Sequence, residues 1–188
     1  YLFFKRLTDI ILSLLALICF SPVFLGVWIA NRFGDNKGPL FFKQTRIGKN
    51  GKPFKMYKFR SMTNKKDNNG KLLPESERLT KAGVLLRSSS LDELPEIWSI
   101  FIGKMSIIGP RPLPTYYEPY YFNEEWARHD VRGGLLPPDS LSGDTTPSWE
   151  TQLEYDRYYA ENLSFALDCK VLWVTFKILF MRTKENYG

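Results

Sequence analysis

The chain has 188 residues, enough for one domain with a modest hydrophobic core. Its 26 basic residues outnumber 20 acidic ones, and the net charge of +6 favours a partner that carries phosphate, an anionic lipid or nucleic acid. The two cysteines, Cys19 and Cys169, exclude a disulfide framework and indicate a reducing compartment. Because the sequence begins at Tyr1 rather than methionine, we expect that an N-terminal piece precedes it.

An uncharged run of 21 residues extends from residue 10 to residue 30. As a straight helix it would be about 30 Å long, which is enough to cross the hydrocarbon of a bilayer. It is too long for a buried core helix or a signal peptide, and no small-residue cleavage site follows it. Ser21-Pro22, near its middle, predicts a break in the helix, since proline removes one backbone hydrogen bond.

Basic residues stand at both ends of this run: Lys5, Arg6, Arg32 and Lys37. A spanning helix usually has its basic excess on one side only. Matching ends favour a segment that dips into the membrane and returns to the same face, although a single kinked span remains an alternative. We therefore predict a re-entrant membrane helix over residues 1–38 and a cytosolic-face catalytic domain with membrane-interface helices over residues 39–188.

The next stretch predicts a basic β-hairpin, with strands over residues 40–44 and 53–60 and a turn at Asn50-Gly51. Ten basic residues and no acidic one lie between Asp35 and Asp67. Strand alternation puts Phe59 on the face of Lys55, opposite Lys58. We expect a mobile loop over residues 63–77.

Lys58 and Arg60 lie among apolar neighbours in the second strand. A charge held there needs a partner, and phosphate is a plausible one. Basic residues mixed with Phe and Tyr could also form a platform for single-stranded nucleic acid. The apolar run argues against that alternative, so we expect no nucleic-acid partner.

The acidic pair Asp92-Glu93 stands where a loop is expected to become a helix. Helices are predicted over residues 77–87 and 90–101, the second with a core stripe of Leu94, Ile97, Trp98 and Phe101 and an end at Gly103.

The acidic pair has two interpretations. Ser90-x-x-Glu93 has the spacing of a capping box, or Asp92 itself caps the helix. Alternatively, a helix N-terminus beside Arg87 attracts phosphate, and a carboxylate there could attack phosphorus.

Arg111 stands between two prolines, which stiffen the backbone on both sides of it. An immobilised guanidinium is well suited to bind phosphate through two parallel hydrogen bonds. A plain turn without a binding role would have the same sequence.

The remaining chain predicts further helices, over residues 116–121, 124–129 and 149–159. His129, the only histidine, has no metal-spaced partner and is interpreted as structural. Residues 165–181 carry only Asp168, Lys170 and Lys177 as charges and favour a helix in the membrane interface over a second span.

Four features in order resemble the monotopic phosphoglycosyl transferases, a family of bacterial sugar transferases. They are the apolar segment broken at Ser21-Pro22, Met56-Tyr-Lys-Phe-Arg-Ser-Met62, Ser90-Leu-Asp-Glu-Leu-Pro95 and Gly103-Lys-Met-Ser-Ile-Ile-Gly-Pro-Arg-Pro112. The resemblance extends from the N-terminus to about residue 113 and again from residue 149 to the end.

The resemblance implies transfer of a sugar-1-phosphate from a UDP-sugar to undecaprenyl phosphate, with release of UMP. Asp92 matches the family's nucleophile, which forms a phosphosugar–enzyme intermediate, and Glu93 matches its partner. Mg²⁺ is the family's metal, with Asp92 as an expected ligand. The expected location is the cytosolic face of the bacterial inner membrane, in contact with its lipid. The glycan pathway, the role of Glu93 and the oligomeric state stay open.

One part of the family pattern is changed. Arg132, an expected phosphate ligand, is kept, but the usual Gly-Trp-x-Gln loop is replaced by Gly133-Gly-Leu-Leu-Pro-Pro138. That loop is expected to help bind the nucleotide or sugar, so the identity of the sugar stays open.

The fold class that follows is α+β and mainly helical: a re-entrant membrane helix, a small β-hairpin and interfacial amphipathic helices around a compact catalytic domain. A competing hypothesis is a non-catalytic membrane adaptor that binds anionic lipid through its basic face. The intact Asp92-Glu93 pair near Arg87 argues against the adaptor, which has no need of an acidic pair there.

Overall fold

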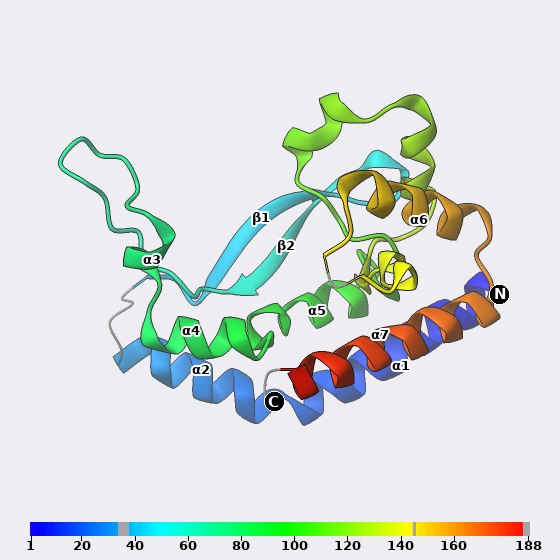
Figure 1. Cartoon of the computed structure of the whole chain (residues 1–188). Coiled ribbons are helices and arrows are strands. Elements are labelled where there is room, and N and C mark those ends of the chain that lie inside the picture. The colour runs from blue at the N-terminus through cyan, green and yellow to red at the C-terminus, as the bar shows by residue number, and fades with distance from the viewer. Residues whose placement is uncertain (34–37, 145, 186–188) are drawn as a thin grey trace. The chain divides into compact units, whose positions relative to one another are not determined.

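The computed structural model describes residues 1–33, 38–144 and 146–185, so Lys37 lies outside the described residues. Helices predominate, with two small two-stranded sheets, and the predicted α+β, mainly helical class is confirmed (Figure 1). The helices are α1 (Leu2–Cys19), α2 (Ser21–Phe33), α3 (Glu75–Arg78), α4 (Lys81–Ser88), α5 (Glu96–Phe101), α6 (Trp149–Glu161) and α7 (Phe165–Glu185). The strands are β1 (Phe41–Ile47), β2 (Pro53–Phe59), β3 (Ser106–Ile108) and β4 (Gly134–Leu136). The 3₁₀ turns are η1 (Lys49–Gly51), η2 (Leu91–Glu93), η3 (Thr115–Tyr120), η4 (Asn123–His129) and η5 (Pro138–Ser142).

The contacts divide the chain into two compact units, each discontinuous in sequence. Unit 1 comprises Tyr1–Ile11, Thr45–Lys55 and Ile100–Gly188, and unit 2 comprises Leu12–Gln44 and Met56–Ser99. The helix α1 and the β1–β2 hairpin each contribute residues to both units. The predicted division into a membrane segment over residues 1–38 and a catalytic domain over residues 39–188 stays a prediction.

The break between α1 and α2 falls at the predicted Ser21-Pro22 pair. The Ser21 hydroxyl donates to the Ile18 carbonyl at 2.7 Å, and Pro22 occupies the first turn of α2, where a missing N–H costs little. By length and composition α1 and α2 together could cross a membrane, bent by 52° at the break, whereas no helix of the described residues could do so alone (Figure 1).

The hairpin turns where the sequence predicted it. Asn50 and Gly51 have φ of 58° and 69°, in the left-handed region that these two residue types tolerate best. Strand β1 continues past the predicted end at residue 44, to Ile47. The predicted faces of β2 are wrong at Phe59, which is 2% exposed because it packs on the rings of Phe24 and Phe41.

The segment over residues 63–77 is irregular up to the start of α3, as predicted for a loop, and its mobility stays a prediction. Within the predicted loop, Lys66 bridges Leu72, and Asp67 Oδ1 accepts hydrogen bonds from two backbone N–H groups. The predicted helix over residues 77–87 is two helices, because the Thr80 hydroxyl accepts from Gly83 N–H at 2.9 Å and starts α4 anew.

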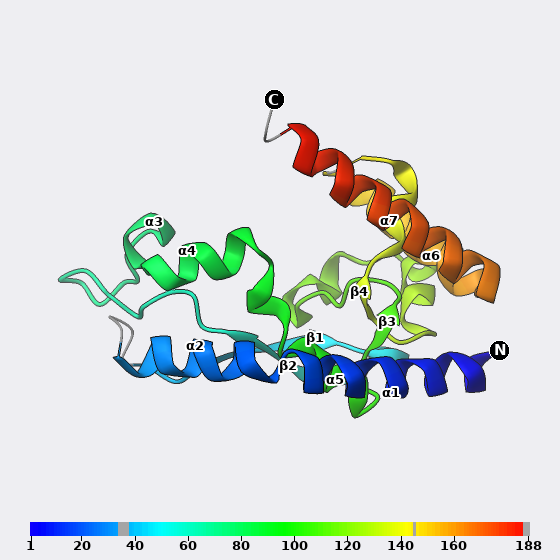
Figure 2. The same ribbon diagram turned by 90° about the horizontal axis from the view of Figure 1, so that it is seen from below.

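Unit 1 is built around a short parallel sheet. Strand β3 pairs with β4, and α7 packs on both strands (Figure 2). The core beneath them comprises Ile108, Val131, Tyr159, Leu167 and Val171. The predicted helix over residues 149–159 is confirmed as α6, while the segments at 116–121 and 124–129 form the 3₁₀ turns η3 and η4.

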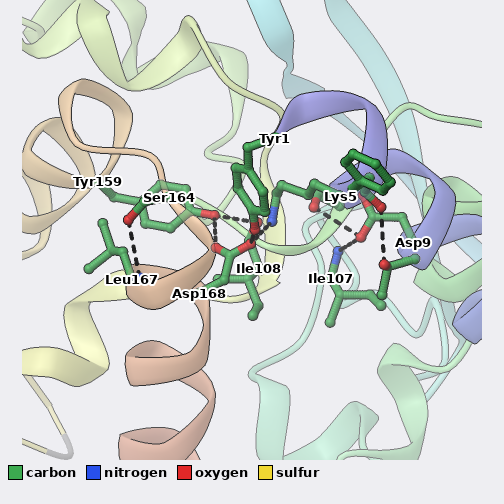
Figure 3. Close-up of polar contacts among 12 residues, drawn as sticks. Tyr1, Lys5, Asp9, Ile107, Ile108, Tyr159, Ser164, Leu167 and Asp168 are labelled. Atoms are coloured by element: carbon green, nitrogen blue, oxygen red, sulfur yellow. Dashed lines mark hydrogen bonds and ion pairs between the residues drawn. The ribbon is translucent and has the colours of Figure 1, made fainter.

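A carboxylate on α7 gathers polar groups from the start of the chain and from α6 (Figure 3). Asp168 Oδ2 lies 2.6 Å from Lys5 Nζ and accepts a hydrogen bond from the Tyr1 hydroxyl. Asp168 Oδ1 accepts from the Tyr159 hydroxyl at 2.5 Å, and that hydroxyl also lies 3.1 Å from the Ile108 carbonyl. The start of α1 is thereby attached to α6 and α7.

The next turn of α1 is attached by further polar contacts. Asp9, only 3% exposed, accepts from the Ser106 hydroxyl at 3.1 Å and from Ile107 N–H at 2.9 Å (Figure 3). The Arg6 guanidinium donates to two carbonyls at the end of α5, both at 2.7 Å. Lys5 and Arg6 were interpreted as a basic flank of a membrane segment, but both are engaged within unit 1.

We predict that Asp168→Ala lowers the free energy of unfolding by about 3–5 kcal/mol, because it leaves the Lys5 ammonium and the Tyr1 phenol without their acceptor and removes one of the two acceptors near the Tyr159 hydroxyl. Glu161→Ala, at an exposed position on α6, is the control and should stay within about 0.5 kcal/mol of the parent. Chemical denaturation followed by circular dichroism measures both. Equal stability of the two variants would contradict an anchoring role for Asp168.

Candidate active site

The segment that carries the acidic pair begins with a strained serine. Ser90 has φ of 55°, a left-handed conformation that is uncommon for any residue other than glycine. It starts the single 3₁₀ turn η2, and α5 begins only at Glu96, so the predicted helix start at residue 90 is wrong. Strain of this kind is concentrated at functional sites.

Neither capping interpretation of the acidic pair is borne out. The Ser90 side chain makes no capping hydrogen bond, so the Ser90–Glu93 capping box is absent. Asp92 lies inside η2 and Pro95 directly precedes α5, so Asp92 is not the N-cap of α5. The pair therefore occupies a short turn whose conformation does not depend on carboxylate capping.

The buried face of α5 differs from the predicted stripe. Ile97 and Ile100 are 7% and 1% exposed, whereas Trp98 is 49% exposed. The buried face differs from the predicted one because α5 begins at Glu96, after the separate turn η2, and not at residue 90. Glu96 is also on the buried face, at 4% exposure.

Lys58 connects strand β2 to the acidic turn in unit 2. Its ammonium lies 2.5 Å from Glu93 Oε1 and 3.3 Å from Glu96 Oε1. The predicted need of Lys58 for an anionic partner is therefore met by two carboxylates, and its role toward phosphate stays a prediction. The sequence analysis missed Glu96, although a charged residue within an apolar helical stripe is a signal of a buried pair.

Asp92 is half-buried beside this ion pair. Burial raises the pKa of its carboxyl above the ordinary value, and the charge of Glu93 raises it further. Lys58 and Arg87 lower the same pKa and so favour the ionised form. A partly desolvated carboxylate held ionised by nearby cations is suited to act as a nucleophile.

Arg87 is held loosely in unit 2. Its Nε donates to the Ser61 hydroxyl at 3.2 Å, and its Nη1 lies 3.2 Å from Glu75 Oε2. The side chains of Arg87 and Glu75 are 44% and 74% exposed, so this ion pair contributes little and is easily exchanged for another anion. The predicted role of Arg87 toward phosphate stays a prediction.

Arg60 borders a largely apolar pocket of about 430 Å³ in unit 2. Its backbone N–H donates to the Leu40 carbonyl at 2.9 Å, but its Nε is buried and has no hydrogen-bond partner among the described residues. The other lining residues come mainly from α2 and α4: Val23, Gly26, Val27, Ala30, Asn31, Thr80, Lys81, Ala82, Leu85, Leu86 and Leu91. The pocket thus has largely apolar walls, with the charged residues Arg60 and Lys81 among its lining.

The other two predicted phosphate ligands belong to unit 1. Arg111 has an exposed side chain in the Pro110–Pro112 turn. Arg132 Nε donates to the Gly103 carbonyl at 2.9 Å, which uses one nitrogen of its guanidinium. Among the predicted site residues, contacts within unit 2 therefore link Lys58 to Glu93.

His129 has the structural environment that its sequence predicted. It is 6% exposed and packs on Tyr121 and Trp126. Burial lowers its pKa to about 4, and the Arg128 charge lowers it too, so the ring is neutral near pH 7.

No cluster of three or more acidic, histidine or cysteine residues capable of holding a metal occurs in the part of the chain that the structure describes. Asp92 and Glu93 are consecutive carboxylates, the ligand type that Mg²⁺ prefers, although Glu93 is ion-paired with Lys58, and a metal at Asp92 stays a prediction. This ion typically takes one or two carboxylates and completes its shell with water and substrate phosphate.

Comparison with known proteins identifies the family. A family model described as bacterial sugar transferase matches residues 1–182. The chain belongs to this family. It is therefore an enzyme, a phosphoglycosyl transferase, which confirms the sequence prediction and does not favour the adaptor hypothesis.

Three relatives illustrate the range of the family. The chain is 42% identical to the uncharacterized sugar transferase EpsL of Bacillus subtilis (strain 168), covering 91% of this chain and 84% of that protein. It is 39% identical to the UDP-glucose:undecaprenyl-phosphate glucose-1-phosphate transferase of Klebsiella pneumoniae, covering 92% and 39%. It is 30% identical to the UDP-N-acetylgalactosamine-undecaprenyl-phosphate N-acetylgalactosaminephosphotransferase of Aeromonas hydrophila, covering 95% and 44%. The chain thus spans less than half the length of the last two proteins.

We predict that Lys58→Met shifts the acid limb of the transferase pH–rate profile to higher pH. Lys58 lowers the pKa of Asp92, so its removal raises that pKa, and the ionised carboxylate is lost at a higher pH as the solution is acidified. Lys55→Met is the control, because Lys55 is exposed on the same strand. An acid limb that stays in place in a folded Lys58→Met variant would contradict this electrostatic link.

Proposed function

We propose that the transferase moves a sugar-1-phosphate from a UDP-sugar to undecaprenyl phosphate and releases UMP, the first step in assembly of a bacterial surface glycan. The names of the Klebsiella and Aeromonas relatives support a nucleotide-sugar donor and an undecaprenyl-phosphate acceptor. The observation that carries the proposal is the Asp92 carboxylate, half-buried in a strained turn with Lys58 and Arg87 near it. The identity of the sugar is left open by the changed loop at residues 133–138.

In the first half-reaction the Asp92 carboxylate attacks the phosphorus that bears the sugar. A bond forms between the carboxylate oxygen and phosphorus, the bond from this phosphorus to the bridging oxygen breaks, and UMP leaves. In the second half-reaction a phosphate oxygen of the acceptor attacks the same phosphorus and releases the Asp92 carboxylate. The product is an undecaprenyl diphosphate sugar, and the enzyme returns to its starting state.

The residues near Asp92 support this sequence of steps by charge and position. Lys58 holds Glu93 and lowers the pKa of Asp92 against the larger effect of burial, while Arg87 can exchange its exposed ion pair for a donor phosphate. Asp92 and Glu93 would hold Mg²⁺, which when bound neutralises diphosphate charge and makes UMP a better leaving group.

Exposed apolar side chains support attachment to the cytosolic face of the inner membrane. On α1 and α2 they include Phe3, Phe4, Leu15, Ile18, Leu25 and Trp28, and on α7 they include Phe165, Trp173 and Phe176. We propose that the bent α1–α2 pair is the re-entrant, monotopic membrane segment and that α7 lies in the interface.

The apolar pocket beside Arg60 suits the acceptor lipid. Its walls match isoprene units, and the positive charges of Arg60 and Lys81 at its lining match an anionic head group. Because the pocket is lined by α2, the lipid would enter it from the proposed membrane side.

We predict that Asp92→Asn abolishes the chemistry while the fold survives, with activity falling by several orders of magnitude, because an amide is no nucleophile. With UDP-sugar and no acceptor, the parent should release UMP in an amount no greater than the enzyme present, and labelled sugar phosphate should stay on Asp92. Asp130→Asn, at an exposed site, is the control and should keep the burst. A folded, active Asp92→Asn variant together with no acceptor-independent burst would sink the covalent mechanism.

We predict that Gly26→Trp raises the KM for undecaprenyl phosphate and leaves the acceptor-independent UMP burst unchanged. Gly26 lines the pocket and a Cβ there meets no atom within 4 Å, so an added side chain fills the pocket without displacing its walls at that point. Leu25→Trp, on the same helix at 57% exposure and outside the pocket lining, is the matched control. Equal KM values for the two variants would show that the acceptor does not use this pocket.

A further inference from the structure

The Pro110–Pro112 turn is held by its carbonyl oxygens. The two prolines have no N–H to donate, so this stretch can be fixed only through its acceptors and through Arg111 itself. All three carbonyls accept a hydrogen bond: Pro110 from Gly134 N–H at 2.9 Å, Arg111 from Arg128 Nη2 at 2.8 Å, and Pro112 from Arg46 Nη1 at 3.0 Å. The donors come from three different segments of unit 1.

Close packing beneath the turn leaves little freedom there. A Cβ on Gly133 would come within 2.5 Å of Pro112 Cγ, and one on Gly134 within 2.1 Å of Gly109 N. Only glycine fits at both positions, so the backbone after Arg132 lies directly against the turn.

Arg128 is the side chain that fixes the middle carbonyl, and it is buried at 3% exposure. Its Nη1 donates to the Tyr121 hydroxyl at 2.8 Å, and its Nη2 lies 2.6 Å from Asp156 Oδ2. The ion-paired side chains are 2% and 4% exposed, and a pair so buried is maintained only with further hydrogen bonds that offset its desolvation. The Arg111 carbonyl supplies one of these bonds.

We infer that Arg128, held by Asp156 and Tyr121, is a positioning residue that pre-organises the Arg111 guanidinium for donor phosphate. This inference rests on the proposed function, in which Arg111 binds phosphate. Arg128 acts through the peptide of Arg111: it fixes the carbonyl at the centre of a turn whose φ angles the prolines already restrict. The Arg111 side chain then extends from a backbone that is held in one orientation. Less conformational entropy is therefore lost when the guanidinium binds phosphate.

The charges around Asp156 couple this arrangement to pH. Burial raises the pKa of Asp156 to about 7; Arg128 and Arg111 lower it and Asp139 raises it. The Tyr121 hydroxyl, which accepts from Arg128 Nη1, is a second titratable group at this arginine, and burial raises its pKa. As pH falls through about 7, Asp156 takes up a proton and the Arg128 ion pair weakens, so donor phosphate is held less well on the acid side.

The test is the rate of the UMP burst with UDP-sugar in a double-mutant cycle. Arg128→Gln should slow the burst roughly 10–100-fold, the usual cost of a misplaced binding group. In an Arg111→Ala background the same change should have less than about a twofold further effect, since Arg128 acts only through Arg111. Multiplicative losses in the double variant, or a parental burst rate in a folded Arg128→Gln variant, would overturn the inference.

The matched control is Arg157→Gln. Arg157 also connects α6 to η4, through Glu124 at 2.7 Å, but the side chains of this ion pair are 39% and 81% exposed, and among the described residues Arg157 has no hydrogen bond or ion pair with the turn. Its burst rate should equal that of the parent. A slowing equal to that of Arg128→Gln would show that any loosening between α6 and η4 is enough, and would overturn the specific role of Arg128.

Two isosteric variants keep the inference testable if Arg128→Gln fails to fold. Tyr121→Phe removes one contact of Arg128. It should slow the burst when Arg111 is present, and it should have no effect in the Arg111→Ala variant. Asp156→Asn should do the same and should flatten the pH dependence of the burst near pH 7. Equal effects of either variant in both backgrounds would overturn the inference. An absent burst in the parent would instead contradict the proposed function, so the two failures are distinguishable.

Discussion

One ammonium group between two carboxylates determines the geometry of the acidic turn. Lys58 reaches Glu93 and the buried Glu96 from strand β2, so it joins the hairpin to both η2 and α5. The turn that holds Asp92 has a left-handed serine at its start and only one short 3₁₀ turn of its own. Local backbone preferences cannot keep such a segment in place, and the charged contact supplies the long-range restraint that they lack.

Unit 1 uses the same principle at other places where regular structure is short. A buried arginine pairs with Asp156 to hold a turn that contains two prolines, and Asp168 collects groups from α1 and α6. The pair of Arg128 with Asp156 fixes a turn that has few backbone hydrogen bonds, whereas Asp168 joins α7 to the helices α1 and α6. The protein thus relies on buried polar contacts where its small sheets and short helices give little cooperative support.

Features set by neighbouring residues were predictable from the sequence. The break at Ser21-Pro22, the turn at Asn50-Gly51 and helix α6 follow from local backbone chemistry and periodicity. The start of α5 was not predictable, because the left-handed conformation of Ser90 is uncommon for a residue other than glycine and no sequence pattern indicates it.

The same distinction applies to the candidate site. Motif resemblance pointed to Asp92 and Arg111, but their supporting residues Glu96, Arg128 and Asp156 have no motif of their own. Their functions depend on pairs separated by up to tens of residues, such as Lys58 with Glu96 and Arg128 with Asp156. A charged residue on an otherwise apolar helical face was the signal available in the sequence, and it marks a buried pair without identifying the partner.

In the proposed membrane setting, the polar contacts at the start of α1 would limit how deeply this helix can insert into the bilayer. Asp9 and Arg6 are bonded to backbone groups of unit 1, and the uncharged run begins at the very next residue, Ile10. The folded protein, rather than the lipid, therefore sets how far α1 enters the bilayer. In that setting α1 could not slide to match a thicker or thinner membrane. The surrounding lipid, or the part of the segment beyond the bend, would then have to adjust to the difference in hydrophobic thickness.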